Sequence, residues 1–301
     1  MNFEKKYRYT GDDNLKLNKL KTTPMPKYKD KKEQIKTDIQ DDIQKMAARQ
    51  QMLYAEGTYG VLIVLQAMDA AGKDGMIRHV FSGINPEGCE VTSFKQPSKK
   101  ELSHDYLWRC HLAMPSRGKI GIFNRSYYED VLVDRVHPEI LAGEHLPGIK
   151  TAADVKPKFF KDRYNDINQF ENYETRNGFM ILKFFLHISK DEQKRRFESR
   201  IETPEKNWKF SESDIKERKY WNQYEKAYND AIESTSSPKN PWYIIPADDK
   251  WFSRLVVSKI INARLEKLPL AYPEVTPEQK QGLKTALDEL EGGKKSQQQK
   301  K

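Results

Sequence analysis

The residues best suited to chemistry lie at positions 69–75, where Asp69, Gly72 and Lys73 follow a short apolar run and precede a helical pattern. Backbone N–H groups at the start of a helix point toward a bound anion, and a lysine adds a full positive charge. The order of strand, small-residue loop and helix therefore favours a phosphate-binding loop. Its expected phosphate-contacting residues are Ala70, Ala71, Gly72, Lys73, Asp74, Gly75 and, one turn into the helix, Arg78.

This loop departs from the standard GxxxxGK[ST] pattern at two positions. Ala67 stands at the first glycine, and Asp74 stands where a serine or threonine normally holds Mg²⁺. A metal-dependent site without that hydroxyl needs another oxygen ligand, and Asp69 is the candidate. The plain alternative is that Gly72 and Lys73 form an ordinary turn between a strand and a helix.

A second pair of charged residues, Arg125 and Glu129, follows another apolar run at 119–123. In open parallel sheets, ligands bind at the carboxyl ends of the strands, so this pair is expected near the phosphate loop. An arginine placed there can clamp a phosphoryl group during its transfer. If a helix begins near Arg125, the spacing of four also allows a simple salt bridge on one helix face.

A third group of basic residues follows the apolar run at 180–188 and includes Arg196, Arg200 and Lys209. Arg196 and Arg200 are one helical turn apart. Enzymes that transfer phosphoryl groups often close a mobile basic lid over the phosphates, which excludes water. Acidic residues such as Glu192 and Glu198 are interspersed, so a solvated charged helix is the alternative.

These three groups need a scaffold of alternating strands and helices. Short apolar runs predict strands, and periodic apolar residues between them predict helices. The resulting pattern indicates an α/β fold with a mainly parallel sheet of about five strands and helices on both faces. Expected strands are 60–67, 89–94, 119–123, 180–188 and 242–245; expected helices are 32–55, 102–113, 159–175, 213–234 and 250–268.

The chain is expected to form one main domain. Residues 1–30 are read as an extended arm, 31–270 as a single domain with a helical lid at about 190–220, and 271–301 as a helix with a disordered tail from Gly292. No cluster of linker residues divides the central part.

Composition limits the class of protein. The 53 basic and 44 acidic residues give a net charge of +9, which suits an anionic partner or merely a surface of solvated lysines. There is no apolar run of about 18 residues for a membrane span and no apolar core for a secretory signal. Cys89 and Cys110 form no CxxC pair, which favours reduced thiols and a cytoplasmic location.

Together these motifs resemble those of the type-2 polyphosphate kinases, most closely the subgroup called class III. The resemblance covers about residues 30–265, most of the chain. The matching stretches are residues 67–75, 93–98, 104–109, 123–130, 184–190, 204–211 and 241–248.

The resemblance implies a three-layer α/β/α P-loop-type fold similar to thymidylate kinase. It implies Mg²⁺-dependent transfer of phosphoryl groups between inorganic polyphosphate and AMP, ADP or ATP, with GMP and GDP as further acceptors. It also implies a homo-oligomer, tetramer or dimer, that binds neither nucleic acid nor membrane. Asp69 is then the metal ligand, and the nucleotide contacts are Lys95, Pro97, Asp105, Arg109, Asn124 and Tyr128.

Two positions distinguish this chain within the family it resembles. Many relatives outside class III have Asp-Arg where this chain has Asn124 and Arg125. The family often has Asn where Glu129 stands, and Glu is typical of the subgroup that accepts AMP as well as ADP. The rival interpretations are an ATP-dependent nucleoside monophosphate kinase on the same fold and a noncatalytic basic protein that binds polyanions.

Overall fold

The computed structural model describes residues 1–298, with side chains through residue 291, and divides the chain into two compact units, Met1–Leu270 and Ala271–Lys301. Among the described residues the sheet has six strands in the order β1-β6-β5-β2-β4-β3. The strands are β1 (Arg8–Tyr9), β2 (Gly60–Gln66), β3 (Cys89–Ser93), β4 (Ile120–Asn124), β5 (Phe179–His187) and β6 (Trp242–Pro246). Strands β2 to β6 are parallel, which confirms the predicted sheet.

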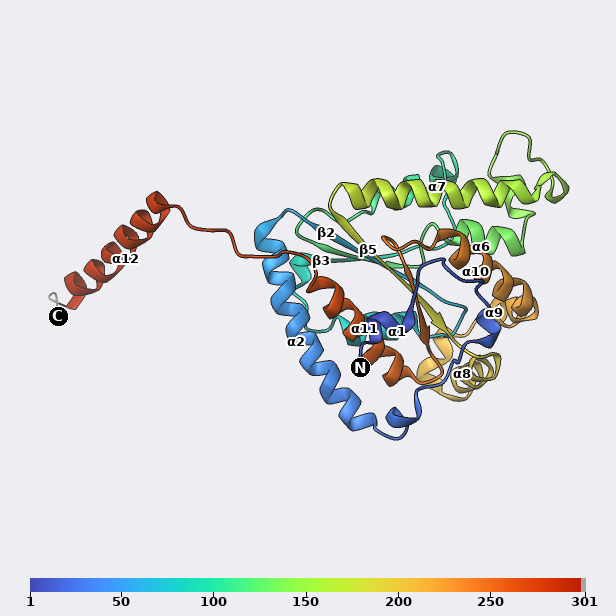
Figure 1. The fold of residues 1–301 in the computed structure, drawn as a ribbon, viewed down its shortest axis with the longest axis horizontal. Helices are drawn as coiled ribbons and strands as arrows, with labels where there is room; N and C mark the ends of the chain where they lie inside the picture. Colours follow the sequence, from blue (N-terminus) through green and yellow to red (C-terminus); the bar gives the residue numbers. More distant parts are fainter. Residues whose placement is uncertain (299–301) are drawn as a thin grey trace. The chain divides into compact units, whose positions relative to one another are not determined.

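Helices cover both faces of this sheet, as the resemblance implied (Figure 1). One face carries α2 (Lys32–Glu56), α3 (Lys73–Val80) and α11 (Lys250–Leu265). The other carries α6 (Glu129–Val136), α7 (Pro157–Arg176) and α10 (Trp221–Thr235). The central strands are fully buried because both faces are covered, and this explains their continuous apolar sequences.

Two predicted helices are broken in the structure. The one predicted at 102–113 is replaced by α4 (Lys99–Leu102) and α5 (Trp108–Leu112). The one predicted at 213–234 is divided into α9 (Glu212–Glu217), the 3₁₀ turn Arg218–Tyr220 and α10. Over the predicted lid, α8 (Lys190–Glu202) is followed by the 3₁₀ helix Pro204–Lys209 and then α9.

The N-terminal arm is more structured than its polar sequence predicts. It contains α1 (Phe3–Tyr7), and β1 pairs antiparallel with β6 at the sheet edge. Phe3, Leu15 and Leu17 are buried, so apolar residues at wide spacing dock the arm onto the domain. Its spacing matches neither strand nor helix periodicity, which is why the sequence predicts only an extended segment.

The second unit contains α12 (Pro277–Gln298). Helix α12 is drawn through Gln298, and the disordered tail expected from Gly292 stays a prediction. Residues 299–301 lie outside the described residues. Throughout the described part of the chain, every helix is too short or too polar to cross a lipid bilayer.

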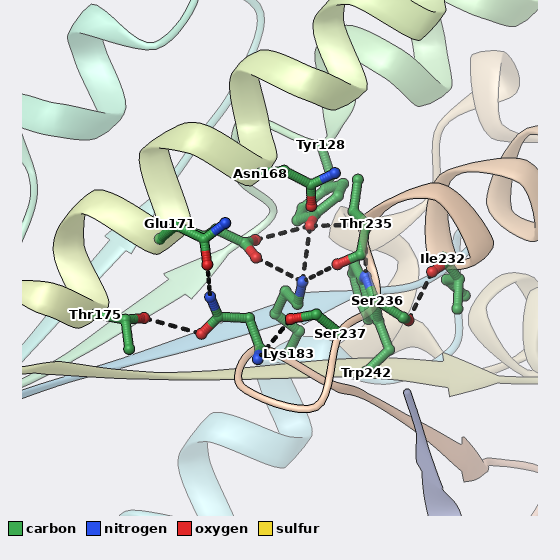
Figure 2. A network of polar contacts seen from close by, with 12 residues as sticks. Tyr128, Asn168, Glu171, Thr175, Lys183, Ile232, Thr235, Ser236, Ser237 and Trp242 are labelled. Carbon is green, nitrogen blue, oxygen red and sulfur yellow. Dashed lines mark hydrogen bonds and ion pairs between the residues drawn. The ribbon is translucent and has the colours of Figure 1, made fainter. Parts of the chain in front are cut away.

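A buried ion pair ties the elements of one face together (Figure 2). Lys183 of β5 is fully buried and donates to Glu171 Oε2 of α7 at 2.6 Å, to the Thr235 carbonyl of α10 at 2.6 Å and to Tyr128 Oη at 3.2 Å. All three ammonium protons therefore have acceptors. Burial lowers the pKa of Lys183, and the Glu171 carboxylate opposes that shift.

Glu171 also receives the hydroxyl groups of Tyr127 and Tyr128, at 3.0 and 2.8 Å from its Oε1. These two tyrosines lie between Arg125 and Glu129 in the turn that leads into α6. The core network therefore anchors the turn that carries the predicted clamp residues. A fully satisfied buried network of this kind makes one arrangement of the turn strongly preferred.

We expect Lys183→Met to lower the free energy of unfolding by about 3–5 kcal/mol, because it leaves the buried Glu171 carboxylate without its cation. Urea denaturation measures the loss. The double variant Lys183→Met/Glu171→Gln removes both charges and is expected to regain part of it. Equal instability of the single and double variants would show that the unpaired charge is not the cause.

Candidate phosphate-transfer site

The loop after β2 has the conformation of an anion cradle. Ala70 and Gly72 have φ values of 61° and 106°, in the left-handed region, and α3 begins at Lys73. Such turns of the backbone direct successive N–H groups into one concavity. Lys73 Nζ donates to the Ala67 carbonyl at 3.0 Å, which folds the lysine back along the loop. Burial and the nearby Arg125 lower the pKa of Lys73, while Asp69, Glu129 and Asp74 raise it.

Helix α8 holds the carbonyl side of this loop. Gln193 Nε2 donates to the Asp69 carbonyl at 3.0 Å, and Arg196 Nη1 donates to the carbonyls of Ala70 and Ala71 at 3.1 and 2.6 Å. These three consecutive carbonyls are thus turned toward α8. On the opposite side of these peptide units, the N–H of Ala71 donates to the Met68 carbonyl at 3.3 Å, and the N–H groups of Ala70 and Gly72 remain for an anion.

The structure corrects the expectation that Arg196 reaches over the phosphates. Its remaining donors bind Glu192 Oε1 at 2.7 Å and the carbonyls of Ala247 and Asp248 at 2.6 and 3.1 Å. All five N–H groups of the guanidinium are therefore engaged, and the side chain is only 6% exposed. Arg196 is a structural support of the loop, and the basic sequence around it gave no sign of this.

The predicted clamp residues do meet at the loop. Arg125 Nη2 lies 3.4 Å from Asp69 Oδ1, and its Nη1 lies 3.7 Å from Glu129 Oε2. Arg125 has a φ of 65° and precedes α6, which begins at Glu129, so the pair is not a salt bridge along one helix. Glu129 also accepts from Gln66 Nε2 at 3.0 Å. The charge of Glu129, followed by that of Asp69, raises the pKa of Arg125, which stays cationic.

Arg125 lines three cavities, two of which also include Lys95. The first, of about 450 Å³, is lined by the loop from Asp69 to Asp74 together with Lys95, Asn124 and Lys209. The second, of about 610 Å³, is lined by Phe94, Pro97, Glu129 and residues of α6, and Arg125 belongs to both linings. Arg125 and Lys95 therefore lie between a phosphate cradle and a larger, more apolar space.

Most of the residues that were predicted to contact the nucleotide lie around these cavities. Lys95, Pro97 and Arg109 line the second cavity, Asp105 lines a smaller neighbouring cavity with Pro97, and Asn124 faces the first. Tyr128 is the exception. It is fully buried in the core network of Figure 2, so the structure corrects its assignment as a nucleotide contact.

The predicted lid, residues 190–220, contacts the phosphate loop through Lys209. Lys209 Nζ lies 3.6 Å from Asp74 Oδ2, and Arg200 Nη1 lies 3.2 Å from Asp214 Oδ2. Arg200 and Lys209 both line the first cavity, whereas Arg78 is exposed and does not. Trp208, beside Lys209, is 78% exposed. The segment from Pro204 to Glu212 carries its charges at the surface and has few packed side chains.

Oxygen ligands suitable for a hard cation are present at the loop. The carboxylates of Asp69 and Asp74 are 31% and 69% exposed and line the first cavity. Magnesium prefers such ligands and keeps several waters, which an open cavity permits. The chemistry of these carboxylates therefore fits a divalent cation such as Mg²⁺.

A denser acidic group, Asp130, Asp134 and Glu144, has its carboxylates within 4.8 Å of one another. Arg163 already pairs with two of these carboxylates, with Nη1 2.6 Å from Asp134 and Nη2 2.8 Å from Glu144. The guanidinium of Arg163 thus occupies the place that a metal ion would take between these carboxylates. Burial and the Glu144 carboxylate nonetheless raise the pKa of Asp134 to about 7, against the opposing charge of Arg163.

Several residues of the site escape sequence reasoning. Gln66 and Gln193 position Glu129 and the loop through uncharged side chains on a strand and a helix, where glutamine carries no functional signal. Phe94 lines the second cavity and packs edge-to-face on Phe123 at 4.8 Å between ring centroids. An apolar residue at the end of a strand is read first as core.

The fold and the site together define a P-loop-type phosphotransferase, and comparison with known proteins identifies its family. Residues 28–270 match the family described as Polyphosphate kinase 2 (PPK2). The ADP-polyphosphate phosphotransferase of Rhodopseudomonas palustris is 48% identical over 279 residues, which is 93% of this chain and 95% of that protein. The AMP/ADP-polyphosphate phosphotransferase of Meiothermus ruber is 43% identical over 270 residues, 90% of this chain and 96% of that protein.

A solved structure agrees. The crystal structure of polyphosphate kinase 2 from Arthrobacter aurescens TC1 superimposes with a TM-score of 0.84 at 34% identity, covering 95% of this chain and 97% of that one. The chain belongs to the polyphosphate kinase 2 family. The predicted family and P-loop kinase fold are confirmed.

We expect Arg196→Lys to loosen the phosphate loop, because three ammonium donors replace five guanidinium donors. Losing buried hydrogen bonds should cost about 1–3 kcal/mol locally. Hydrogen–deuterium exchange measures it as faster exchange in residues 69–73. Arg200→Lys, which affects a side chain bound to Asp214 and the Lys209 carbonyl, is the matched control and is expected to leave that exchange unchanged. Equal protection in both variants would contradict the support role of Arg196.

Proposed function

We propose that this protein transfers the terminal phosphoryl group of inorganic polyphosphate to AMP and ADP, with Mg²⁺ as its cofactor. The observation that carries the proposal is the position of Arg125, which belongs to the linings of both the phosphate cavity and the larger cavity beside it. A phosphoryl group that passes between a polyphosphate in the first and a nucleotide in the second passes this side chain. The names of the two relatives, from Rhodopseudomonas palustris and Meiothermus ruber, support the same substrates.

The chain's own residues supply charge and position. The loop N–H groups and Lys73 hold the phosphate that is transferred, and Arg125 neutralises the charge that spreads over its oxygens. The nucleotide lies with its terminal phosphate at Arg125 and its base toward Phe94 and Pro97. Lys209 and Arg200 close the first cavity from the lid, which excludes water. Asp69 would hold a bound Mg²⁺, which would supply positive charge to offset that of the phosphates.

Glu129 determines whether the shorter nucleotide AMP can serve as an acceptor. AMP has one phosphate fewer than ADP, so its phosphate must be held closer to the loop. Glu129 pairs with Arg125 and lines the nucleotide cavity, where a carboxylate can hold the water shell of a second cation. We therefore include AMP as an acceptor beside ADP.

Other features are proposed from the family and from general chemistry. Donor and acceptor bonds are both phosphoanhydrides, so transfer is expected in either direction, and guanine nucleotides are expected as further acceptors. We also propose a cytoplasmic homo-oligomer, tetramer or dimer, without nucleic-acid or membrane partners.

The function is tested by incubating the protein with AMP, ADP and long-chain polyphosphate, with and without Mg²⁺, and separating the nucleotides by chromatography. ADP and ATP are expected only when polyphosphate and Mg²⁺ are both present. Turnover of AMP with ATP but not with polyphosphate would identify a nucleoside monophosphate kinase instead. Polyphosphate binding that weakens with salt, without any turnover, would identify a binding protein.

The same assay needs a variant that disables only the proposed chemistry. Lys73→Ala removes the loop charge and is expected to reduce kcat about 100-fold or more. Lys45→Ala removes the same charge from the exposed surface of α2 and is the matched control. Near-normal turnover of Lys73→Ala would contradict the assignment of the loop.

Glu129→Asn is expected to lower the rate with AMP at least about tenfold relative to the rate with ADP, a difference of about 1.4 kcal/mol. Glu139→Gln removes a carboxylate from the same cavity without touching Arg125 and should leave the ratio of the two rates unchanged. Steady-state rates with each acceptor at saturating polyphosphate give this ratio. If Glu129→Asn phosphorylates AMP as fast as the parent protein, the role of Glu129 is wrong.

A further inference from the structure

Helix α12 presents an apolar stripe to solvent. From Pro277 to Glu291 every residue is exposed, including Leu283 at 63%, Leu287 at 56% and Leu290 at 70%. The three leucines are four and three positions apart, so they lie on one side of the helix, as in the seam of a coiled coil. An exposed apolar stripe of this kind indicates a surface that binds another protein chain.

The rest of α12 gives the helix little reason to form alone. Thr276 Oγ1 accepts from the N–H of Gln279 at 3.2 Å, and Gln279 Oε1 accepts from the N–H of Thr276 at 2.9 Å. This cap fixes where the helix begins but buries no apolar surface. Gly282 lies inside the helix, where glycine is much less favourable than alanine. Helices in proteins are held mainly by the packing of an apolar face, so α12 calls for a partner.

The charges between residues 280 and 291 are divided along the helix. Lys280 and Lys284 come first, and Asp288, Glu289 and Glu291 follow. Among residues 277–291, these side chains form no ion pair with one another. Two such helices side by side in the same direction would place like charges together. In opposite directions, the basic part of each helix lies beside the acidic part of the other. The charge pattern therefore favours an antiparallel second copy of the same helix.

The same arrangement also aligns the stripes. Reversing a second helix about the centre of the stripe places Leu283 of each copy level with Leu290 of the other. Lys284 and Glu291 are seven positions apart, so both lie on the same flank of the stripe. In an antiparallel pair, equal flanks face each other. Lys284 therefore lies beside Glu291 of the second copy, and the symmetry of the pair forms this contact twice.

We propose that α12 binds α12 of a second copy of this chain in antiparallel orientation, with the leucine stripes in contact and each basic part beside the acidic part of the other. The helix follows residues 28–270, which match the family, so this contact is additional to any formed by the family domain. The inference does not depend on the proposed function.

The proposed contact is small. Leu283 to Leu290 span about two helical turns. Two such stripes bury less than the ~1,200 Å² of a standard protein interface. Pairing is therefore expected to be weak by itself and strongest between copies that are already held near each other. A disulfide that traps the pair is suited to detect such weak association.

The test uses the full chain with Leu283→Cys or Leu290→Cys, oxidised separately and as an equimolar mixture, and measures covalent dimer on non-reducing gels. An antiparallel pair brings the two positions together only in the mixture, where we expect at least about threefold more dimer than in either variant alone. Thr285→Cys, on the opposite side of α12, is the matched control for random collision. The parent protein gives the background from its own thiols, and burial raises the pKa of Cys89 to about 11, which keeps it unreactive.

A charge reversal tests the orientation independently. Lys284→Glu, added to both cysteine variants, places like charges beside Glu291 and is expected to lower dimer in the mixture at least about threefold. Adding Glu291→Lys as well restores opposite charges in an antiparallel pair, and the dimer should return. Ala286→Cys keeps all three leucines and lies near the centre of the stripe, so it is expected to form dimer by itself.

Each other outcome overturns the inference. More dimer in the separate variants than in the mixture would show a parallel pair. Dimer no higher than with Thr285→Cys, for the mixture and for Ala286→Cys alike, would show that the stripe is not a contact between copies of α12. Charge reversal without effect, or without restoration by Glu291→Lys, would show that the two charges do not lie beside each other.

Discussion

The geometry of the phosphate loop depends on what holds its carbonyl groups. A loop that presents its N–H groups to an anion must direct its carbonyls elsewhere, and buried carbonyls need donors. Gln193 and Arg196 of α8 supply those donors to three consecutive residues, 69 to 71. Arg196 also binds the carbonyls of Ala247 and Asp248 after β6. The loop is thus fixed to two neighbouring strand ends, and its left-handed residue Ala70 is held in place.

A second, independent support holds the other half of the site. The turn that carries Arg125 is anchored in the core by Tyr127, which donates to Glu171. Tyr128 anchors it as well through contacts with both Glu171 and Lys183 (Figure 2). The two supports lie on opposite sides of the sheet, since Lys183 faces α7 and the loop leads into α3. Arg125 and Asp69 approach each other where these rigid halves meet. Positioning of this kind is what phosphoryl transfer requires most from a protein.

The sequence was sufficient to predict the strands, the layers and the loop, because buried parallel strands and a Gly-Lys helix start leave strong local signals. It also identified Asp69, Lys73, Arg125 and Glu129, which the fold brings together. It failed where function depends on contacts distant in sequence. Arg196 has the same residue type as a phosphate ligand, and Tyr128 lies beside Glu129 in sequence. Only the direction of each side chain distinguishes a residue that supports the site from one that contacts the ligand. Packing in the folded protein determines that direction.

The edge strand β1 has a consequence for how the chain is made. Arg8 and Tyr9 are translated more than 200 residues before their partners Trp242 and Tyr243. Throughout that interval the arm has no surface to dock on, and the outer side of β6 does not yet exist. Closure of the sheet edge must therefore be a late step of folding, completed only when nearly all of the first unit has been translated.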